Sequence, residues 1–125
     1  MKYSFRGNRT LIVGEQEIKF PHQIYEVMDF DTVVVVEISS GGDSIDMAKE
    51  PRNNIYAVTE HGKILWNIKD VVKITHLYKT APFDGYYKIL KKIDESHIKL
   101  WEFGGFILTI NVFTGIVTEL EARRF

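Results

Sequence analysis

The chain has 125 residues with a formal net charge of −1, and 45% of its residues are hydrophobic and 13% aromatic. This length and composition allow one domain with its own hydrophobic core and exclude a disordered tail. The chain contains no cysteine, which excludes disulfide bonds, thiolate zinc sites and catalysis by a thiol.

Short β-rich segments separated by turn residues recur along the chain, and helical periodicity is nearly absent. In chain order, the pattern predicts strands over residues 10–13, 17–20, 24–30, 32–39, 55–59, 63–68, 71–77, 86–92, 97–103, 106–112 and 116–120. Residues 33–36 are four consecutive valines, so we expect their strand to be central and covered on both faces. We predict an all-β domain with at least ten strands and no helix longer than about three turns.

Two stretches of the chain resemble each other, because residues 24–38 align without gaps on residues 89–103. The identical or similarly apolar pairs are Ile24/Ile89, Met28/Ile93, Asp29/Asp94, Val33/Ile98, Val35/Leu100, Val36/Trp101, Glu37/Glu102 and Ile38/Phe103. Residues 55–58 also align on residues 107–110, and Gly62 falls on Gly115 after one inserted residue. We interpret residues 1–125 as a single domain with repeat-like halves over about 10–70 and 71–122; convergent strand patterning is the alternative.

Residues 54–66, Asn-Ile-Tyr-Ala-Val-Thr-Glu-His-Gly-Lys-Ile-Leu-Trp, resemble the blade motif of quinoprotein-like β-propellers, with a strand, a glycine turn and a tryptophan-bearing strand. Residues 111–115 resemble the Asp-x-x-Thr-Gly turn of the same blades, with Asn111 in place of aspartate. A closed propeller needs at least about four blades and this chain holds roughly two. The chain therefore cannot carry the central quinone site of that family, and the resemblance implies the strand topology and nothing about a cofactor. We expect two tandem antiparallel strand meanders, packed as a small two-sheet sandwich or a propeller-blade-like pair.

No motif for catalysis or metal binding is found in the sequence. The four histidines, His22, His61, His76 and His97, are isolated, and no glycine-rich phosphate loop or nucleophile elbow is present. We expect no catalytic site, no metal and no cofactor; an enzyme whose carboxylates meet only in space is the alternative. Lysines at 88, 91 and 92 beside aromatic residues could contact single-stranded nucleic acid, but the chain is not basic overall and we do not expect such binding.

Acidic residues are concentrated between Glu26 and Glu50, where seven acids accompany one base, Lys49. Such a field can steer a basic partner, whereas a solvated surface that only aids solubility is the alternative. Our candidate partner-binding residues are Glu26, Asp29, Asp31, Asp43, Asp46 and Glu50. The last three lie in a long loop, residues 39–53, where we expect solvated side chains and a short helix over 44–49 capped by Asp43. A mobile insertion is the alternative for this loop.

The N-terminal residues lack the apolar stretch of a signal peptide, and no apolar run reaches membrane-spanning length, so we expect a cytoplasmic protein without membrane contact. A small, cysteine-free, locally acidic profile resembles that of bacterial immunity proteins, which neutralise a cognate toxin. That resemblance implies a non-catalytic domain whose acids face a basic toxin domain, such as a nuclease. The alternatives are a structural or scaffold β-module that binds another protein, and an unrecognised small enzyme or ligand-binding barrel.

Overall fold

The computed structural model describes residues 1–41, 49–74 and 85–122, which form eleven strands and one helix. The elements are β1 (Ser4–Arg6), β2 (Thr10–Val13), β3 (Gln16–Lys19), β4 (Gln23–Asp29), β5 (Val33–Ser39), β6 (Ile55–Thr59), β7 (Ile64–Asn67), α1 (Ile68–Ile74), β8 (Tyr87–Lys92), β9 (His97–Glu102), β10 (Phe106–Asn111) and β11 (Ile116–Ala122). The predicted all-β fold is confirmed. β1 was not predicted.

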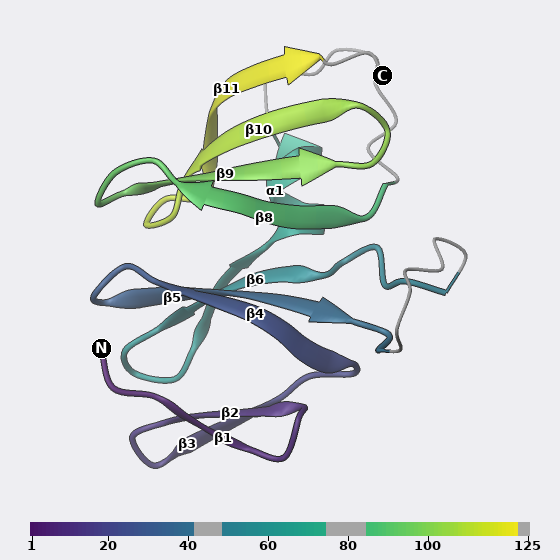
Figure 1. The fold of residues 1–125 in the computed structure, drawn as a ribbon. Helices are drawn as coiled ribbons and strands as arrows, with labels where there is room; N and C mark the ends of the chain where they lie inside the picture. Colours follow the sequence, from purple (N-terminus) through teal and green to yellow (C-terminus); the bar gives the residue numbers. More distant parts are fainter. Residues whose placement is uncertain (42–48, 75–84, 123–125) are drawn as a thin grey trace.

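The strands form three antiparallel meanders, ordered β1-β2-β3, β4-β5-β6-β7 and β8-β9-β10-β11. Figure 1 shows the sheets stacked, with β4–β7 between the other two. Side chains of β2 meet those of β5 and β6 in one hydrophobic cluster, and the two four-stranded sheets share a second, larger one. The expected pair of packed meanders is therefore confirmed, and the three-stranded sheet forms a third layer.

The valine strand β5 holds the stack together. Val33 and Val35 belong to the cluster shared with β8–β11, whereas Val34 and Val36 belong to the cluster shared with the first sheet. All seven residues of β5 are buried. Burying a valine side chain contributes roughly 1.5 kcal/mol or more, so a strand without polar alternation is stable only between two layers. The predicted central position of this strand is confirmed.

The predicted strand over residues 71–77 is wrong, because residues 68–74 form the helix α1, and residues 75–77 lie outside the described part. The side chain of Asn67 accepts a hydrogen bond from the backbone N–H of Asp70 (3.1 Å), and its amide donates to the Asp70 carboxylate (2.9 Å). This reciprocal capping begins the helix. Ile68, Val71 and Val72 then share one buried face at helical spacing.

In the second strands of the two four-stranded sheets, β5 and β9, residues paired by the gapless alignment do not point the same way. β5 and β9 run in the same direction (Figure 1), so equivalent positions should face the same way. Val35 and Leu100, which were aligned, instead point into one cluster from opposite sheets. The third strands, β6 and β10, agree with the alignment better. Each has a bulge at the aligned position, between Ala57 and Val58 in β6 and between Thr109 and Ile110 in β10. Duplication of the chain stays a prediction.

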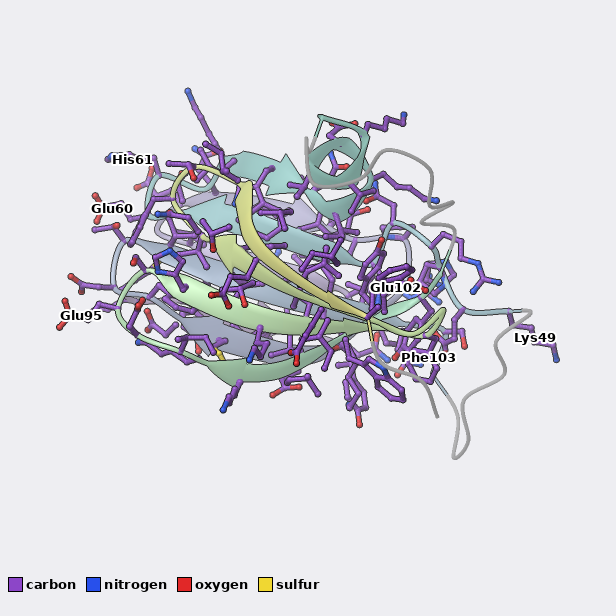
Figure 2. All side chains as sticks on the ribbon, turned by 90° about the horizontal axis from the view of Figure 1, so that it is seen from above. Lys49, Glu60, His61, Glu95, Glu102 and Phe103 are labelled. Atoms are coloured by element: carbon purple, nitrogen blue, oxygen red, sulfur yellow. The ribbon has the colours of Figure 1, made fainter. Side chains whose placement is uncertain are left out.

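The meander topology creates two different ends. The first and third turns of each four-stranded sheet lie together at one end, which we call the turn end; it comprises residues 30–32, 60–63, 93–96 and 112–115. The connections between the second and third strands lie at the opposite end, the loop end. Figure 2 shows this separation: Glu60, His61 and Glu95 lie at one end, whereas Glu102 and Phe103 lie at the other.

Candidate functional site

The predicted partner-binding acids that the structure describes do not form one surface. Asp29 and Asp31 lie at the turn end, and Glu26 is half-buried on β4. Glu50 lies at the loop end. Asp43 and Asp46, with the predicted helix over residues 44–49, lie outside the described residues except at residue 49.

The expectation that Glu50 is solvated is wrong. Its side chain is 5% exposed, and its carboxylate accepts hydrogen bonds from the Ser39 hydroxyl (3.2 Å), the Ser40 hydroxyl (2.9 Å) and the Ser40 backbone N–H (2.9 Å). The chain leaves β5 at Ser39, so the following N–H group has no strand partner and the carboxylate supplies an acceptor. Glu50 therefore fixes the base of the loop and presents no charge to a partner.

Asp29 and Asp31 belong to a tight turn. The backbone N–H of Phe30 donates to the carbonyl of Val33 (2.8 Å), and Asp31 adopts a φ of 73°, which aspartate tolerates better than most residues. Asp29 Oδ1 accepts the N–H of Asp31 (2.8 Å). The Met1 amino group lies 3.7 Å from Asp29 Oδ2 and 3.9 Å from Asp31 Oδ1. The Asp31 side chain is 95% exposed, so its charge is available to a partner.

The β8–β9 turn repeats this arrangement around Asp94. Asp94 Oδ1 accepts the backbone N–H groups of Ser96 (2.8 Å) and His97 (2.8 Å), and it lies 2.9 Å from His97 Nδ1. The Ser96 N–H, followed by the contact with His97, lowers the pKa of Asp94 to about 2. The adjacent Glu95 is exposed. This turn therefore adds two charged carboxylates to the same end of the molecule.

A hollow of about 480 Å³ lies between these two turns. Its lining residues are Phe30, Asp31, Thr32, Lys92, Glu95, Ser96 and Phe113. The Lys92 ammonium lies 4.7 Å from the centre of the Phe30 ring and donates to the Asp29 carbonyl (3.1 Å). The Phe113 ring, 39% exposed, supplies apolar surface beside the carboxylates. Aromatic side chains are enriched at protein interfaces, and the rims of interfaces are polar.

Glu60 joins this end from the β6–β7 turn. Its backbone N–H donates to the Thr32 carbonyl (2.9 Å), which fixes this turn beside the β4–β5 turn. Its side chain is half exposed and lies 3.8 Å from the neighbouring His61 ring. We call the set Asp31, Glu60, Asp94 and Glu95 the acidic turn surface. Three of these four residues were not predicted as site residues, although their positions in hairpin turns were visible in the sequence.

Two further carboxylates lie in the interior, near the loop end. Glu37 is fully buried, and burial raises its pKa to about 7, against the opposing effects of the Ile89 N–H and Lys88. Glu102 is 1% exposed and accepts the N–H of Gly104; burial raises its pKa as well. Neither carboxylate lies on a surface that a partner can reach.

The described residues contain no group of three or more His, Asp or Glu side chains placed to hold a metal ion. Within the same part of the chain, no helix is long and apolar enough to cross a membrane. The turn end presents exposed carboxylates around a hollow whose wall includes the Phe113 ring. Such a surface can attract and seat cationic side chains.

A family model described as "Domain of unknown function (DUF7957)" matches residues 1–122. No curated protein matches the chain, and no solved structure matches it. The likeness to propeller blades therefore stays an interpretation of the sequence and the strand topology.

Proposed function

The matching model spans residues 1–122, so the chain belongs to the DUF7957 family, and we propose that this member is a non-catalytic domain that binds a protein through its acidic turn surface. The observation that carries the proposal is the hollow between Asp31 and Glu95, with Phe113 in its wall. Exposed acids bring a basic partner into place, and the aromatic wall offers apolar contact once water has been displaced.

Exposure is what makes these carboxylates suitable. The Asp31 side chain is 95% exposed, that of Asp94 is 55% exposed, and that of Glu60 is 49% exposed. Exposed carboxylates contribute little to folding, so the charges of Asp31 and Glu60 can serve association, whereas Asp94 also holds its own turn through the N–H groups of Ser96 and His97. Acidic faces speed encounter with basic partners, and the gain is largest at low salt.

For the partner, we propose a basic toxin domain, such as a nuclease, which the protein neutralises in the bacterial cytoplasm as an immunity protein. The support is the combination of small size, absence of cysteine and an acidic surface. An active site that binds nucleic acid is basic, because it must contact phosphates, and it therefore complements exposed carboxylates.

A second candidate is a scaffold module that binds a less charged protein along β1 and β4. A groove of about 510 Å³ lies there, lined by Tyr3, Phe5, Gly7, Asn8, Ile24, Tyr25, Glu26 and Val27. The rings of Phe5 and Tyr25 are 49% and 60% exposed, and exposed aromatic rings favour an apolar contact over charge steering.

The experiment is a capture of partners from lysate with the full chain, followed by binding kinetics with purified partner. The variant D31N/E95Q removes two charges from the rim of the hollow. Its matched control, E119Q/E121Q, removes two charges from exposed positions of β11. We expect the first variant to associate roughly tenfold more slowly at low salt and to lose much of the salt dependence. Equal association rates for both variants would remove the acidic turn surface from the interface.

A further inference from the structure

One buried carboxylate connects the two four-stranded sheets. Glu37 lies near the end of β5, and its Oε1 atom accepts the backbone N–H of Ile89 on β8 at 2.7 Å. The side chain is 0% exposed. The surrounding contact between these sheets is a hydrophobic cluster, so this hydrogen bond is a polar link through an apolar interface.

The groups around Glu37 come from several elements. From β4, Glu26 is its cross-strand neighbour, and from β6 its neighbour is the uncharged Ile55. The Tyr86 hydroxyl, just before β8, donates to Glu37 Oε2 at 3.4 Å. Lys88 on β8 favours the charged form from the periphery, where its ammonium lies 4.6 Å from the centre of the Tyr25 ring. Burial, followed by the charges of Glu37 and Glu50, raises the pKa of Tyr86. Glu102 on β9 is the cross-strand neighbour of Tyr87 on β8.

These surroundings suit a neutral carboxyl group better than a charged one. A buried charge is tolerated when it is paired and fully hydrogen-bonded, whereas Glu37 has one short bond to an N–H, one long bond to a hydroxyl and a like charge as its cross-strand neighbour. The neutral carboxyl keeps the acceptor for Ile89 and loses the cost of the charge. Charging the group is compensated only if water enters the interface.

We propose that Glu37 is a proton-controlled junction between sheet β4–β7 and sheet β8–β11, tight when its carboxyl group is protonated and loosened when it is charged. Burial places the pKa of this group at about 7, so the junction changes state across neutral pH. The first strand of each sheet, β4 or β8, is an edge strand, so loosening begins where those two edges lie near each other.

Glu102 provides the matched comparison. It is as buried as Glu37 and belongs to the neighbouring sheet, but its described hydrogen bond goes to Gly104, two residues further along the chain. It therefore makes no described hydrogen bond between the sheets. E102Q should leave the junction unchanged, whereas E37Q should fix it in the tight form, because glutamine keeps an acceptor oxygen and carries no charge.

The test is amide hydrogen exchange of Ile89 in the full chain between pH 5.5 and 8.5, expressed as protection so that base catalysis is removed. For wild type and E102Q, we expect protection to fall about tenfold or more, with a midpoint near the pKa of Glu37. For E37Q, protection should stay constant. Constant wild-type protection across this range would overturn the proposal.

A second measurement covers the case in which E37Q does not fold. The ¹³C resonance of the Glu37 carboxyl carbon in wild type should titrate near neutral pH, and the Ile89 amide resonance should shift with the same midpoint. A carboxyl resonance that does not titrate between pH 5.5 and 8.5 would also overturn the proposal.

Discussion

The two ends of the molecule carry the same chemical group in opposite settings. At the turn end, Asp31 and Glu95 extend into solvent around a hollow. Near the loop end, Glu37, Glu50 and Glu102 are all less than one-tenth exposed. Figure 2 shows Glu95 and Glu102 at these opposite ends. A carboxylate in water is free to bind and contributes little to folding, whereas a buried one affects stability strongly and cannot meet a partner.

Acidic composition alone therefore does not locate a binding surface. The segment from Glu26 to Glu50 is acidic in sequence, yet it passes from β4 at the turn end to the buried loop base. The exposed acids of the turn end come from three separate hairpins. Strand topology, and not proximity in sequence, decides which charges act together.

A carboxylate placed in the core without hydrogen-bond partners should destabilise the domain more than any other change considered. V35D buries a charge in the cluster between the sheets, where it lacks the hydrogen bonds available to Glu37. We expect a loss of roughly 3–5 kcal/mol in the free energy of unfolding, enough to unfold the domain. L100D on the opposite sheet should behave alike, whereas I116D, at a position that is 59% exposed, should melt close to wild type. A wild-type melting transition in V35D would contradict the assignment of this interface.

The next effect is a pH dependence of stability caused by Glu37. Its folded pKa of about 7 lies above the ordinary value of 4.5, so the folded state binds the proton more tightly than the unfolded state. The contribution to stability is complete below pH 4.5 and is lost as pH rises through 7. The free energy of unfolding should fall by up to about 3 kcal/mol between pH 5 and pH 8. Urea titrations of wild type and E37Q at several pH values would measure this fall. The same change of the free energy of unfolding with pH in both proteins would contradict the prediction.

A smaller effect is expected at the base of the loop. E50A leaves the Ser40 N–H and two hydroxyl groups without their acceptor, so we expect a loss of about 2 kcal/mol in the free energy of unfolding. Thermal melts of E50A beside E95A provide the comparison, because Glu95 is exposed and the substitution is the same. E95A should change the free energy of unfolding by less than about 0.5 kcal/mol. Equal losses in the two variants would mean that burial does not separate these acids.

The strand framework was predictable because its signals are local. Four valines at 33–36 indicated a doubly covered strand, and Gly62 and Gly115 marked turns where φ is 75° and 72°. The helix was missed because its apolar residues were read as a strand, although Asn67 and Asp70 had the spacing of a capping pair.

The site was less predictable because its determinants are spatial. The burial of Glu50 depends on Ser40, ten residues away, and the loop between them gave no indication that its ends meet. The meeting of Glu60 with the 30–32 turn depends on the order of strands in the sheet. Asp31 was predicted as a partner-binding acid, but its companion Glu95 belongs to the other four-stranded sheet.

We propose that position in the stack separates acids that bind a partner from acids that stabilise the fold. The most direct test measures D31N/E95Q and E50A side by side, each for its unfolding midpoint and for its association rate with the captured partner at a temperature where both are folded. We predict that D31N/E95Q associates more slowly with an unchanged midpoint, and that E50A has a lower midpoint with an unchanged association rate. A lower unfolding midpoint in both variants, or slower association in both variants, would contradict this separation.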